Sequence, residues 1–514
     1  MAEGVAVGSY MNIFPQNPFF LPFLGNYKLF FVSLHRKCVH NMLIGRNREK
    51  KELLEAYEAE ESRFVAVYGR RRVGKTYLIR QTFKGKLTFS HSGQAKGTMA
   101  EQLYGWRSSL SDAGYKADRS PKSWLEAFDM LKDFIRQSSS EKKVIFIDEL
   151  PWLDTPKSKF VNALEFFWNG WASGRDDVLL IVCGSATSWI INKLFKNHGG
   201  LHNRVTNRIY LQPFTLNECQ QYILQRGISL SLYDIIECYM VMGGVPFYWS
   251  FLERGKSLAQ NIDDLFFSPY GKLYNEFEEL YRSLFHHPDN YISIVKTLGE
   301  ATGGMTREEI ISKCHITSSG TLTTILEDLE NCGFIRNTPS YGLKNQGVYR
   351  LIDNFTLFYQ KFMRENKNND EKLWSHSYLS SKHKAWVGLA FERVCFQHIR
   401  QIKQALGISG VVTTICSWRT GPSEPGAGDG AQIDMLIDRA DNMVNICEMK
   451  FSDEKYTLSL DDHEKIANRS NRFAKSIGYK KSVNIVMVTV FGITKKGYWS
   501  DVHNIITAED LLKE

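Results

Sequence analysis

From Met42 onward, apolar and polar residues alternate in blocks that predict helices and short buried strands in turn. Helical periodicity is found in residues 48–60, 75–83 and 159–172. Nearly continuous apolar runs predict strands over residues 63–69, 142–150 and 178–186. Buried strands separated by helices indicate a parallel sheet that is covered on both faces. We therefore predict an α/β domain over residues 42–214.

The pattern changes twice further along the chain. Residues 215–288 predict helices only. Residues 289–355 predict three helices followed by a short β-pair, which is the order of a winged helix-turn-helix. The charged, asparagine-rich run "RENKNNDEK" belongs to a predicted linker, residues 356–383. A last α/β unit, residues 384–514, is predicted from alternating helical and strand patterns.

Composition narrows the class of protein only a little. The 514 residues suffice for about three domains, and 43% hydrophobic with 23% charged residues is usual for a globular protein. The net charge of +8 is a mild basic excess that is compatible with a nucleic-acid partner without indicating one. The nine cysteines form no Cys-x-x-Cys pair, so we expect a reducing, cytoplasmic location.

Residues 1–41 include a long apolar and aromatic run, but Pro15, Pro18, Pro22 and Gly25 interrupt it. No stretch reaches the roughly 18–20 apolar residues that a membrane-spanning helix needs. The first residues, Met-Ala-Glu, lack the basic start of a signal peptide. We interpret this segment as a disordered or artefactual leader, with Met42 as the first residue of a coherent fold, and we expect no membrane partner.

The clearest chemical signal is "GRRRVGKT" at residues 69–76, which fits the phosphate-binding pattern G-x-x-x-x-G-K-[ST] between a predicted strand and a predicted helix. Gly69 and Gly74 allow a tight loop whose backbone N–H groups converge on phosphate at the positive end of the helix. Lys75 is expected to bind the β- and γ-phosphates of ATP, and Thr76 to ligate Mg²⁺. The predicted nucleotide-binding residues of the loop are Gly69, Arg70, Arg71, Arg72, Val73, Gly74, Lys75 and Thr76.

Two later strand ends add polar groups to this site. The run "VIFIDEL" ends in Asp148, which is expected to hold Mg²⁺ through its hydration shell, and Glu149, which is expected to orient the attacking water. The run "LIVCGSAT" contains Ser185 and Thr187, either of which could sense the γ-phosphate or merely cap a helix. We predict Glu149 and Ser185 as catalytic residues.

A cation beside the γ-phosphate is a common way to stabilise the charge of phosphoryl transfer. The run "GGLHNRVTNRIYLQPF" offers two arginines for this role. We prefer Arg204 as the catalytic arginine; Arg208 is the competing candidate, and a plain surface arginine is the third interpretation.

These runs resemble an AAA+-related P-loop ATPase of the archaeal-type branch of the STAND signalling ATPases. Four features carry the resemblance: "LIGRNRE" (43–49), "GRRRVGKT" (69–76), "FIDELPWL" (146–153) and "HNRV…LQPF" (202–214). The family's Gly-Arg-x-x-Glu box lies against the adenosine end of the nucleotide, which implies that role for Gly45, Arg46 and Glu49. The run "GGVPFYW" is similar to the family's Gly-x-Pro element, which implies that Pro246 contacts adenine. The resemblance spans residues 42–355 and implies a helical lid and a winged helix after the ATPase core.

A second group of charged residues lies in the last predicted unit. The run "VNICEMKFS" places Glu448 and Lys450 two residues apart on a mostly apolar strand, so both face the same side. Asp434 in "AQIDMLID" lies on the preceding strand, and Glu392 in "GLAFERVCF" lies on the helix before it. Charges at partly buried strand positions need a reason. This order resembles the PD-(D/E)XK nuclease-like fold, a restriction-endonuclease-like α/β domain that accompanies archaeal-type ATPases.

The resemblance implies that Glu392, Asp434 and Glu448 hold Mg²⁺ or Mn²⁺, hard ions that prefer oxygen ligands. Lys450 would be the catalytic residue that positions the attacking water or stabilises the developing charge. The family's Pro-Asp pair is absent, since Ile433 precedes Asp434. The alternative is an ordinary ion pair on neighbouring strands. The flexible loop "GPSEPGAGDG" could gate a substrate or close a hairpin.

Three functions fit these patterns. The first is an ATP-dependent switch that controls a Mg²⁺-dependent nuclease-like module acting on DNA. The second is an ATPase scaffold that binds a protein partner or nucleic acid, or that self-associates, and whose C-terminal domain is a catalytically inactive binding module. The third is a signalling ATPase that contacts no nucleic acid and whose winged helix packs internally.

The charge of the predicted recognition helix discriminates among these functions. The run "SGTLTTILEDLENCGF" has Glu327, Asp328 and Glu330 but no lysine or arginine. Helices that contact DNA usually carry cations for the phosphates. Any DNA contact of the winged helix would then use the cations of its wing, Arg336, Lys344 and Arg350. We therefore expect a packing or regulatory role for this helix rather than sequence-specific transcription control.

Overall fold

The computed structural model describes most of the chain from Leu43 onward. The described residues are 43–196, 199–285, 287–301, 303–317, 320–342, 347–378, 380–420 and 430–514. The predicted leader, residue Lys344 of the predicted wing and all but the last residue of the "GPSEPGAGDG" loop lie outside the described residues.

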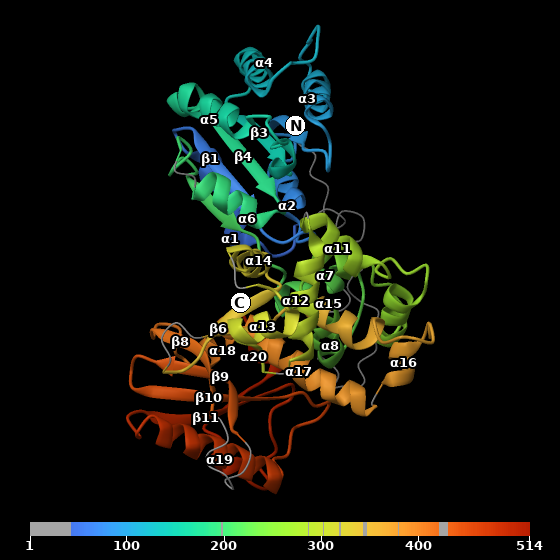
Figure 1. The fold of residues 1–514 in the computed structure, drawn as a ribbon, viewed down its shortest axis with the longest axis vertical. Helices are drawn as coiled ribbons and strands as arrows, with labels where there is room; N and C mark the ends of the chain where they lie inside the picture. Colours follow the sequence, from blue (N-terminus) through green and yellow to red (C-terminus); the bar gives the residue numbers. More distant parts are fainter. Residues whose placement is uncertain are drawn as a thin grey trace, which may run out of the picture. The chain divides into compact units, whose positions relative to one another are not determined.

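The N-terminal domain is built on a five-stranded parallel sheet with the strand order β2-β3-β4-β1-β5 (Figure 1). Its strands are β1 (Arg63–Tyr68), β2 (Leu87–Ser92), β3 (Lys143–Asp148), β4 (Val178–Gly184) and β5 (Asn207–Tyr210). Its helices and helical turns are α1 (Asn47–Glu58), α2 (Lys75–Thr82), α3 (Met99–Asp112), α4 (Trp124–Gln137), η3 (Leu150–Leu153), α5 (Phe160–Gly170), η4 (Ala172–Gly174), α6 (Thr187–Ile190) and η5 (Ile191–Phe195). Every residue of β4 is buried, as expected for a central strand between two helical layers. The predicted parallel α/β sheet is confirmed.

Helices follow the sheet, as the sequence predicts. In the predicted lid they are α7 (Leu216–Gln225), α8 (Leu232–Met242), α9 (Pro246–Trp249), α10 (Leu258–Ile262), η6 (Asp263–Phe267) and α11 (Glu276–Leu284). The next segment has α12 (Pro288–Glu300), α13 (Arg307–Cys314), α14 (Gly320–Asn331), β6 (Ile335–Pro339) and β7 (Gly347–Leu351). Strands β6 and β7 pair antiparallel, with Arg336 opposite Arg350. Three helices and a β-pair thus occur in the predicted order, and the name winged helix stays our interpretation of them.

The structure departs from our expectation of a linker over residues 356–383. This segment includes most of α15 (Asn354–Phe358), η7 (Tyr359–Met363) and α16 (Leu373–Ser377), and it leads into α17 (Ser381–Gln397). The side chains of Phe358, Phe362 and Trp374 are fully buried and contact one another. Only the asparagine-rich run between them is largely exposed. The aromatic residues on each side of that run anchor it to the core.

The C-terminal module has a five-stranded mixed sheet with the order β12-β11-β10-β9-β8. Its strands are β8 (Thr413–Arg419), β9 (Gln432–Arg439), β10 (Met443–Lys450), β11 (Ser482–Thr489) and β12 (Asn504–Ile506). Strands β8, β9 and β10 are antiparallel, whereas β10, β11 and β12 run parallel. Besides α17, its helices are α18 (Ile399–Ala405), α19 (Leu460–Ser476), η8 (Trp499–Asp501) and α20 (Ala508–Leu511).

Two hydrophobic cores dominate the described residues. One fills the N-terminal domain on one face of its sheet and includes Phe64, Trp106 and Phe167. The larger one runs without a break from the lid helices through the predicted winged helix to α17 and β10. Lid, winged helix and C-terminal module therefore share buried apolar surface. No helix in the described ranges is long and apolar enough to span a membrane.

Candidate functional site

The phosphate-binding loop joins β1 to α2 and depends on two glycines. Gly69 has φ +139° and Gly74 has φ +91°, backbone conformations that residues other than glycine rarely adopt. A Cβ atom at Gly69 would also lie 2.4 Å from the carbonyl oxygen of Leu211. The glycines of the motif thus let the loop turn sharply and pack against the strand end beside it, as the sequence pattern predicts.

Lys75, the first residue of α2, points back across the loop. Its ammonium donates hydrogen bonds to the carbonyls of Gly69 (3.0 Å) and Arg70 (2.8 Å). The side chain is buried, and burial lowers the pKa of Lys75. A buried ammonium held only by neutral carbonyls gains strongly from an anion placed against it. This arrangement fits a phosphate group at the loop.

The two predicted Mg²⁺ ligands of this site lie together. The hydroxyl of Thr76 donates to a carboxylate oxygen of Asp148 at 2.8 Å. The other Asp148 oxygen accepts from the Glu149 backbone N–H (3.0 Å) and from the buried thiol of Cys183. Burial, with the Asp148 carboxylate nearby, raises the pKa of that thiol well above its usual range. A hydroxyl from the start of α2 that meets a carboxylate at the end of β3 fits a hydrated Mg²⁺ ion.

Glu149 adopts a strained backbone conformation with φ +45°. Its carboxylate accepts hydrogen bonds from the backbone N–H (3.1 Å) and the hydroxyl (2.9 Å) of Ser185. Left-handed non-glycine residues cost about 1–3 kcal/mol and concentrate at functional sites. The structure therefore joins the two predicted catalytic residues at the ends of neighbouring strands β3 and β4.

The predicted adenosine-binding residues lie beside the loop. The Arg46 guanidinium donates to the carbonyl of Val73 (3.4 Å) and lies 4.7 Å from the ring centre of Phe214. The Arg46 backbone N–H donates to Glu218 of α7 at 3.2 Å. Gly45 has φ +59°, and a Cβ atom there would meet the Glu218 carboxylate. Gly45 and Arg46 thus connect the start of the domain to the loop and to the lid.

The lid reaches the phosphate loop through α9, whose first residue is Pro246. The neighbouring Phe247 ring lies 4.4 Å from the Arg72 guanidinium. Arg72 also pairs with the buried carboxylate of Glu276 on α11 and, at 3.7 Å, with Glu279. The adenine contact of Pro246 stays a prediction, but its segment does lie next to the loop.

The two candidates for the catalytic arginine, Arg204 and Arg208, have different surroundings. Arg204 is exposed in a turn, and among the described residues no side-chain contact joins it to the phosphate loop. Arg208 lies over the ring of Phe195, with 4.6 Å between guanidinium and ring centre. The role of Arg204 remains a prediction, and a surface arginine remains the competing interpretation.

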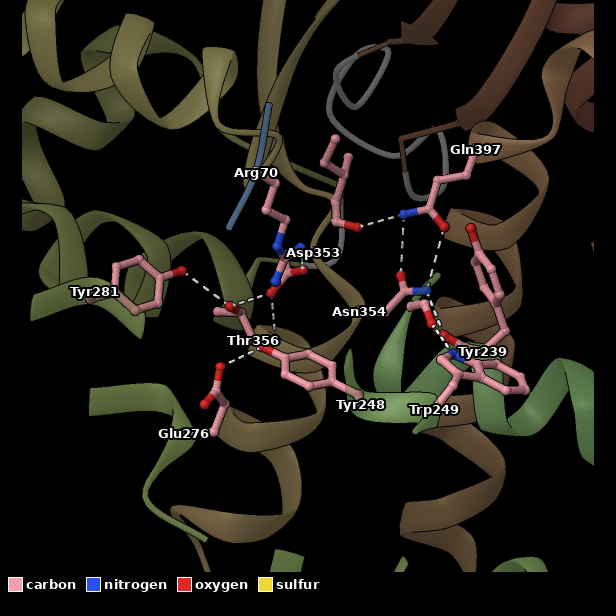
Figure 2. A network of polar contacts seen from close by, with 12 residues as sticks. Arg70, Tyr239, Tyr248, Trp249, Glu276, Tyr281, Asp353, Asn354, Thr356 and Gln397 are labelled. Carbon is pink, nitrogen blue, oxygen red and sulfur yellow. Dashed lines mark hydrogen bonds and ion pairs between the residues drawn. The ribbon is translucent and has the colours of Figure 1, made fainter. Parts of the chain in front are cut away.

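Sequence reasoning missed the partner of Arg70. Its guanidinium forms a buried ion pair with Asp353 (Figure 2), which lies two residues after the end of β7. The side chain therefore points toward the winged helix, and any nucleotide contact of this residue would use its backbone. Long-range pairs of this kind, 283 residues apart, leave no local signal in a single sequence.

Asp353 belongs to a larger polar network (Figure 2). Its other oxygen accepts from the backbone N–H (2.9 Å) and the hydroxyl (2.6 Å) of Thr356. Gln397 of α17 donates to the carbonyl of Ile352 at 3.0 Å, and Asn354 donates to the carbonyl of Tyr239 at 2.7 Å. The network therefore connects the phosphate loop, the lid, the end of β7 and the first helix of the C-terminal module.

The predicted C-terminal site is built by α17, β9 and β10. Burial, and then the neighbouring Asp434 carboxylate, raises the pKa of Glu392 to about 8. Burial also raises the pKa of Glu448, although the Arg469 guanidinium lies 3.0 Å from that carboxylate. The Asp434 carboxylate pairs with Arg350 of β7 at 3.0 Å. The carboxylates are thus close enough to influence one another, but Asp434 and Glu448 are each paired with an arginine, and Asp434 also accepts from the Gln432 amide at 2.7 Å.

This arrangement does not fit a bound divalent ion. Within the part of the chain that the structure describes, no three His, Cys, Asp or Glu side chains are grouped so that they could hold a metal. Lys450 is likewise engaged, since its ammonium pairs with Asp462 of α19 at 3.0 Å. The metal-binding roles of Glu392, Asp434 and Glu448 therefore remain predictions that need a rearranged site.

Two of the expected DNA contacts of the wing, Arg336 and Arg350, have partners within the described residues. Arg350 is largely buried against Asp434, and Arg336 donates to the carbonyl of Phe396 at 3.4 Å. Burial lowers the pKa of Arg336. Both side chains face the C-terminal module instead of solvent. This pairing agrees with a packing or regulatory role for the predicted winged helix.

Comparisons with known proteins agree with the nucleotide site. Residues 43–250 match the family model of an ATPase domain found predominantly in Archaea. An uncharacterized protein of Methanocaldococcus jannaschii is 23% identical over 465 residues, which is 87% of this chain and 95% of that protein. Residues 43–250 of this chain are therefore similar to an archaeal-type ATPase domain, in agreement with the motifs found there.

Solved structures with P-loop ATPase folds are also similar. A Walker-type ATPase of Pyrococcus abyssi has 17% sequence identity and a TM-score of 0.47, and the match covers 62% of this chain and 96% of that one. The ORC2 protein of Aeropyrum pernix, solved as ADPNP–ADP complexes, has 13% identity and a TM-score of 0.39, covering 66% of this chain and 97% of that one.

Proposed function

We propose that this protein is a nucleotide-operated switch, in which ATP binding and hydrolysis at the phosphate loop change the state of the C-terminal module. The observation that carries the proposal is the buried ion pair between Arg70 and Asp353. Arg70 belongs to the loop that would hold the phosphates, and Asp353 lies two residues after β7, the strand whose Arg350 pairs with Asp434. A change at the loop would therefore reach the C-terminal module through one ion pair and a short stretch of backbone.

The residues of the ATPase domain have distinct roles in this proposal. Lys75 would leave the loop carbonyls to bind the β- and γ-phosphates, and Thr76 with Asp148 would hold the hydrated Mg²⁺. Mg²⁺ supplies positive charge to the phosphate oxygens when it is bound. Glu149 would orient the attacking water, and its two hydrogen bonds from Ser185 keep the carboxylate in place.

For the C-terminal module we propose a nuclease-like, divalent-ion-dependent activity on DNA phosphodiesters. Support comes from three carboxylates of separate elements that influence one another, since burial and mutual repulsion raise the pKa of Glu392 and Glu448. The arginine pairing of Asp434 and Glu448 favours a second candidate, an inactive binding module driven by the same switch. The two candidates share the ATPase mechanism and differ only in chemistry at the C-terminal site.

Two measurements test these proposals. Hydrogen exchange of residues 347–356 should change when ATP is added to the full chain and should not change in the Lys75→Ala variant. If hydrogen exchange of these residues in wild type were unchanged with ATP bound, the result would contradict the proposed switch. A cleavage assay with Mg²⁺ or Mn²⁺ on several DNA and RNA forms, with and without ATP, then separates nuclease from binding module.

A further inference from the structure

Arg350 of β7 occupies the C-terminal carboxylate site. One of its terminal nitrogens lies 3.0 Å from the Asp434 carboxylate, and 11% of the Arg350 side chain is exposed. Its Nε and its other terminal nitrogen are buried and, among the residues that the structure describes, have no hydrogen-bond partner. The contact with Asp434 is therefore the main polar interaction that holds this guanidinium in the site.

The surroundings of Arg350 are unfavourable for the binding of an additional cation, such as a divalent metal ion. A cavity of about 20 Å³, room for a single water molecule, lies beside Arg350 and Glu392. Arg336 and Arg393 line the same cavity. Three guanidinium groups at one partly buried site repel a divalent ion, and the charge of Asp434 is already compensated. Arg350 in this position therefore opposes the binding of a divalent ion at Asp434.

The phosphate loop contacts the same segment at Asp353, three residues after Arg350. Asp353 pairs with Arg70, whose Nε and second terminal nitrogen are buried and, within the described ranges, unpartnered. Arg70 and Asp353 line a cavity of about 290 Å³. Because Lys75 hydrogen-bonds the Arg70 carbonyl, a phosphate that attracts Lys75 frees this peptide, and the cavity gives the Arg70 side chain room to move.

The other side of the segment contacts α17. Arg393 donates to the carbonyl of Leu351 at 2.8 Å, and Gln397 donates to the carbonyl of Ile352 at 3.0 Å. Arg393 and Gln397 lie on the helix that carries Glu392. The segment from β7 to Asp353 therefore lies between the phosphate loop and the predicted metal site, with hydrogen bonds or ion pairs to both.

We propose that residues 347–353, the β7 strap, are an autoinhibitory device: Arg350 occupies the Asp434 carboxylate and excludes a divalent cation, and nucleotide at the phosphate loop releases it through Arg70 and Asp353. This inference rests on the proposed function, because it describes the regulation of the same C-terminal site. It assigns to Arg350 a blocking role instead of a DNA contact.

The first experiment measures Mn²⁺ binding to the full chain by electron paramagnetic resonance in the absence of nucleotide. Arg350→Gln should bind Mn²⁺ at least about tenfold more tightly than wild type, because the repulsion of a unit charge a few ångströms away is removed. Arg350→Met should do the same, while Arg350→Lys keeps the charge and should resemble wild type. Adding Asp434→Asn to Arg350→Gln should abolish the gained site.

Arg336→Gln is the matched control. Arg336 faces Arg350 across the β-pair and lines the same cavity, but its hydrogen bond goes to the Phe396 carbonyl instead of Asp434. Its substitution removes the same charge without freeing Asp434, so its gain in Mn²⁺ affinity should be clearly smaller. An equal gain in Arg336→Gln would mean that total charge, not occupation of Asp434, controls the site, and would overturn the strap.

The outcomes separate the strap from the proposed function. If wild type already binds Mn²⁺ in an Asp434-dependent manner as tightly as Arg350→Gln, the strap is wrong and the metal site stands. If neither folded Arg350 variant gains an Asp434-dependent site, the metal-dependent activity fails and the blocking role fails with it.

A second experiment tests nucleotide control of the strap. Hydrogen exchange at residues 348–353 should rise when a non-hydrolysable ATP analogue is added to wild type and should not rise in Lys75→Ala. No rise in wild type would mean that nucleotide does not control the strap.

Discussion

The two carboxylate sites of this protein differ in what compensates their charge. At the end of β3, Asp148 and Glu149 accept hydrogen bonds from neutral donors, the Thr76 and Ser185 hydroxyls among them. In the C-terminal module, Asp434 and Glu448 are paired with guanidinium groups, although Asp434 also accepts from the Gln432 amide at 2.7 Å. A metal ion can displace a neutral hydroxyl at little electrostatic cost, whereas it must expel an arginine.

The comparison suggests that one site is ready for its ligand and that the other is closed. The difference does not lie in the acidic residues themselves, since both sites combine carboxylates with a nearby lysine. It lies in the partners that tertiary structure brings to them. Substitutions that change these partners should therefore affect the two sites in different ways.

The largest expected effect is at the open site. Lys75→Ala removes the ammonium that faces the loop and should abolish ATP binding and hydrolysis. Isothermal titration calorimetry measures the binding, and Lys116→Ala, which removes an exposed lysine outside the proposed sites, is a charge-matched control. ATP affinity in Lys75→Ala equal to that of wild type would contradict the assignment of the phosphate site.

A second substitution separates binding from chemistry. Glu149→Gln keeps the shape of the side chain and should lower the hydrolysis rate by about 10²–10⁴-fold, the usual contribution of a positioned general base. ATP affinity should change little, because Lys75 and Thr76 remain. Steady-state phosphate release measures the rate. Hydrolysis at the wild-type rate would exclude Glu149 as the residue that orients water.

The buried pair that connects the two sites should matter for stability. Asp353→Asn leaves the Arg70 guanidinium buried without its counter-charge and should lower the free energy of unfolding by about 3–5 kcal/mol. Glu279→Gln is the control, because Glu279 is exposed and its 3.7 Å pair with Arg72 should contribute about 0.2–1 kcal/mol. Thermal unfolding of both variants would show the contrast, and equal midpoints would mean that the Arg70 pair stabilises little.

The closed site should show a smaller, pH-dependent effect. The unfolded chain releases the Glu392 proton near pH 4.5, whereas the folded protein keeps it up to about pH 8. The stability that this neutral carboxyl contributes is therefore complete below pH 4.5 and is lost as pH rises toward 8. Denaturant unfolding of wild type relative to Glu392→Gln should show a decrease of roughly 1–3 kcal/mol from pH 5 to pH 8. Parallel pH profiles would contradict the raised pKa.

Local patterns predicted much of this molecule. The phosphate loop, the acidic end of β3 and the alternation of buried strands with helices all depend on residues close in sequence, so one sequence suffices to find them. The linker prediction failed for a local reason as well: the polar run around Asn366 and Asn369 hid the aromatic anchors Phe358, Phe362 and Trp374 on each side of it.

The partners of the charged residues could not be predicted in the same way. Arg350 meets Asp434 across 84 residues and Arg70 meets Asp353 across 283, and no spacing rule connects such positions. Arg350 looked like a DNA contact because the sequence shows only its charge and its place on a wing. Burial and pairing, which decide its role, are properties of the tertiary structure.

The anchoring of α17 limits how this architecture can be divided or recombined. His383, near its start, bonds the buried Glu237 of α8 at 2.8 Å, and His398, just after its end, accepts from the Leu216 backbone N–H at 3.0 Å. Cutting the chain within residues 356–383 would leave Glu237 without this partner inside an apolar core. An evolutionary exchange of one C-terminal module for another would thus have to replace α17 and its contacts on α8 together, so the unit of inheritance is larger than the visible domain.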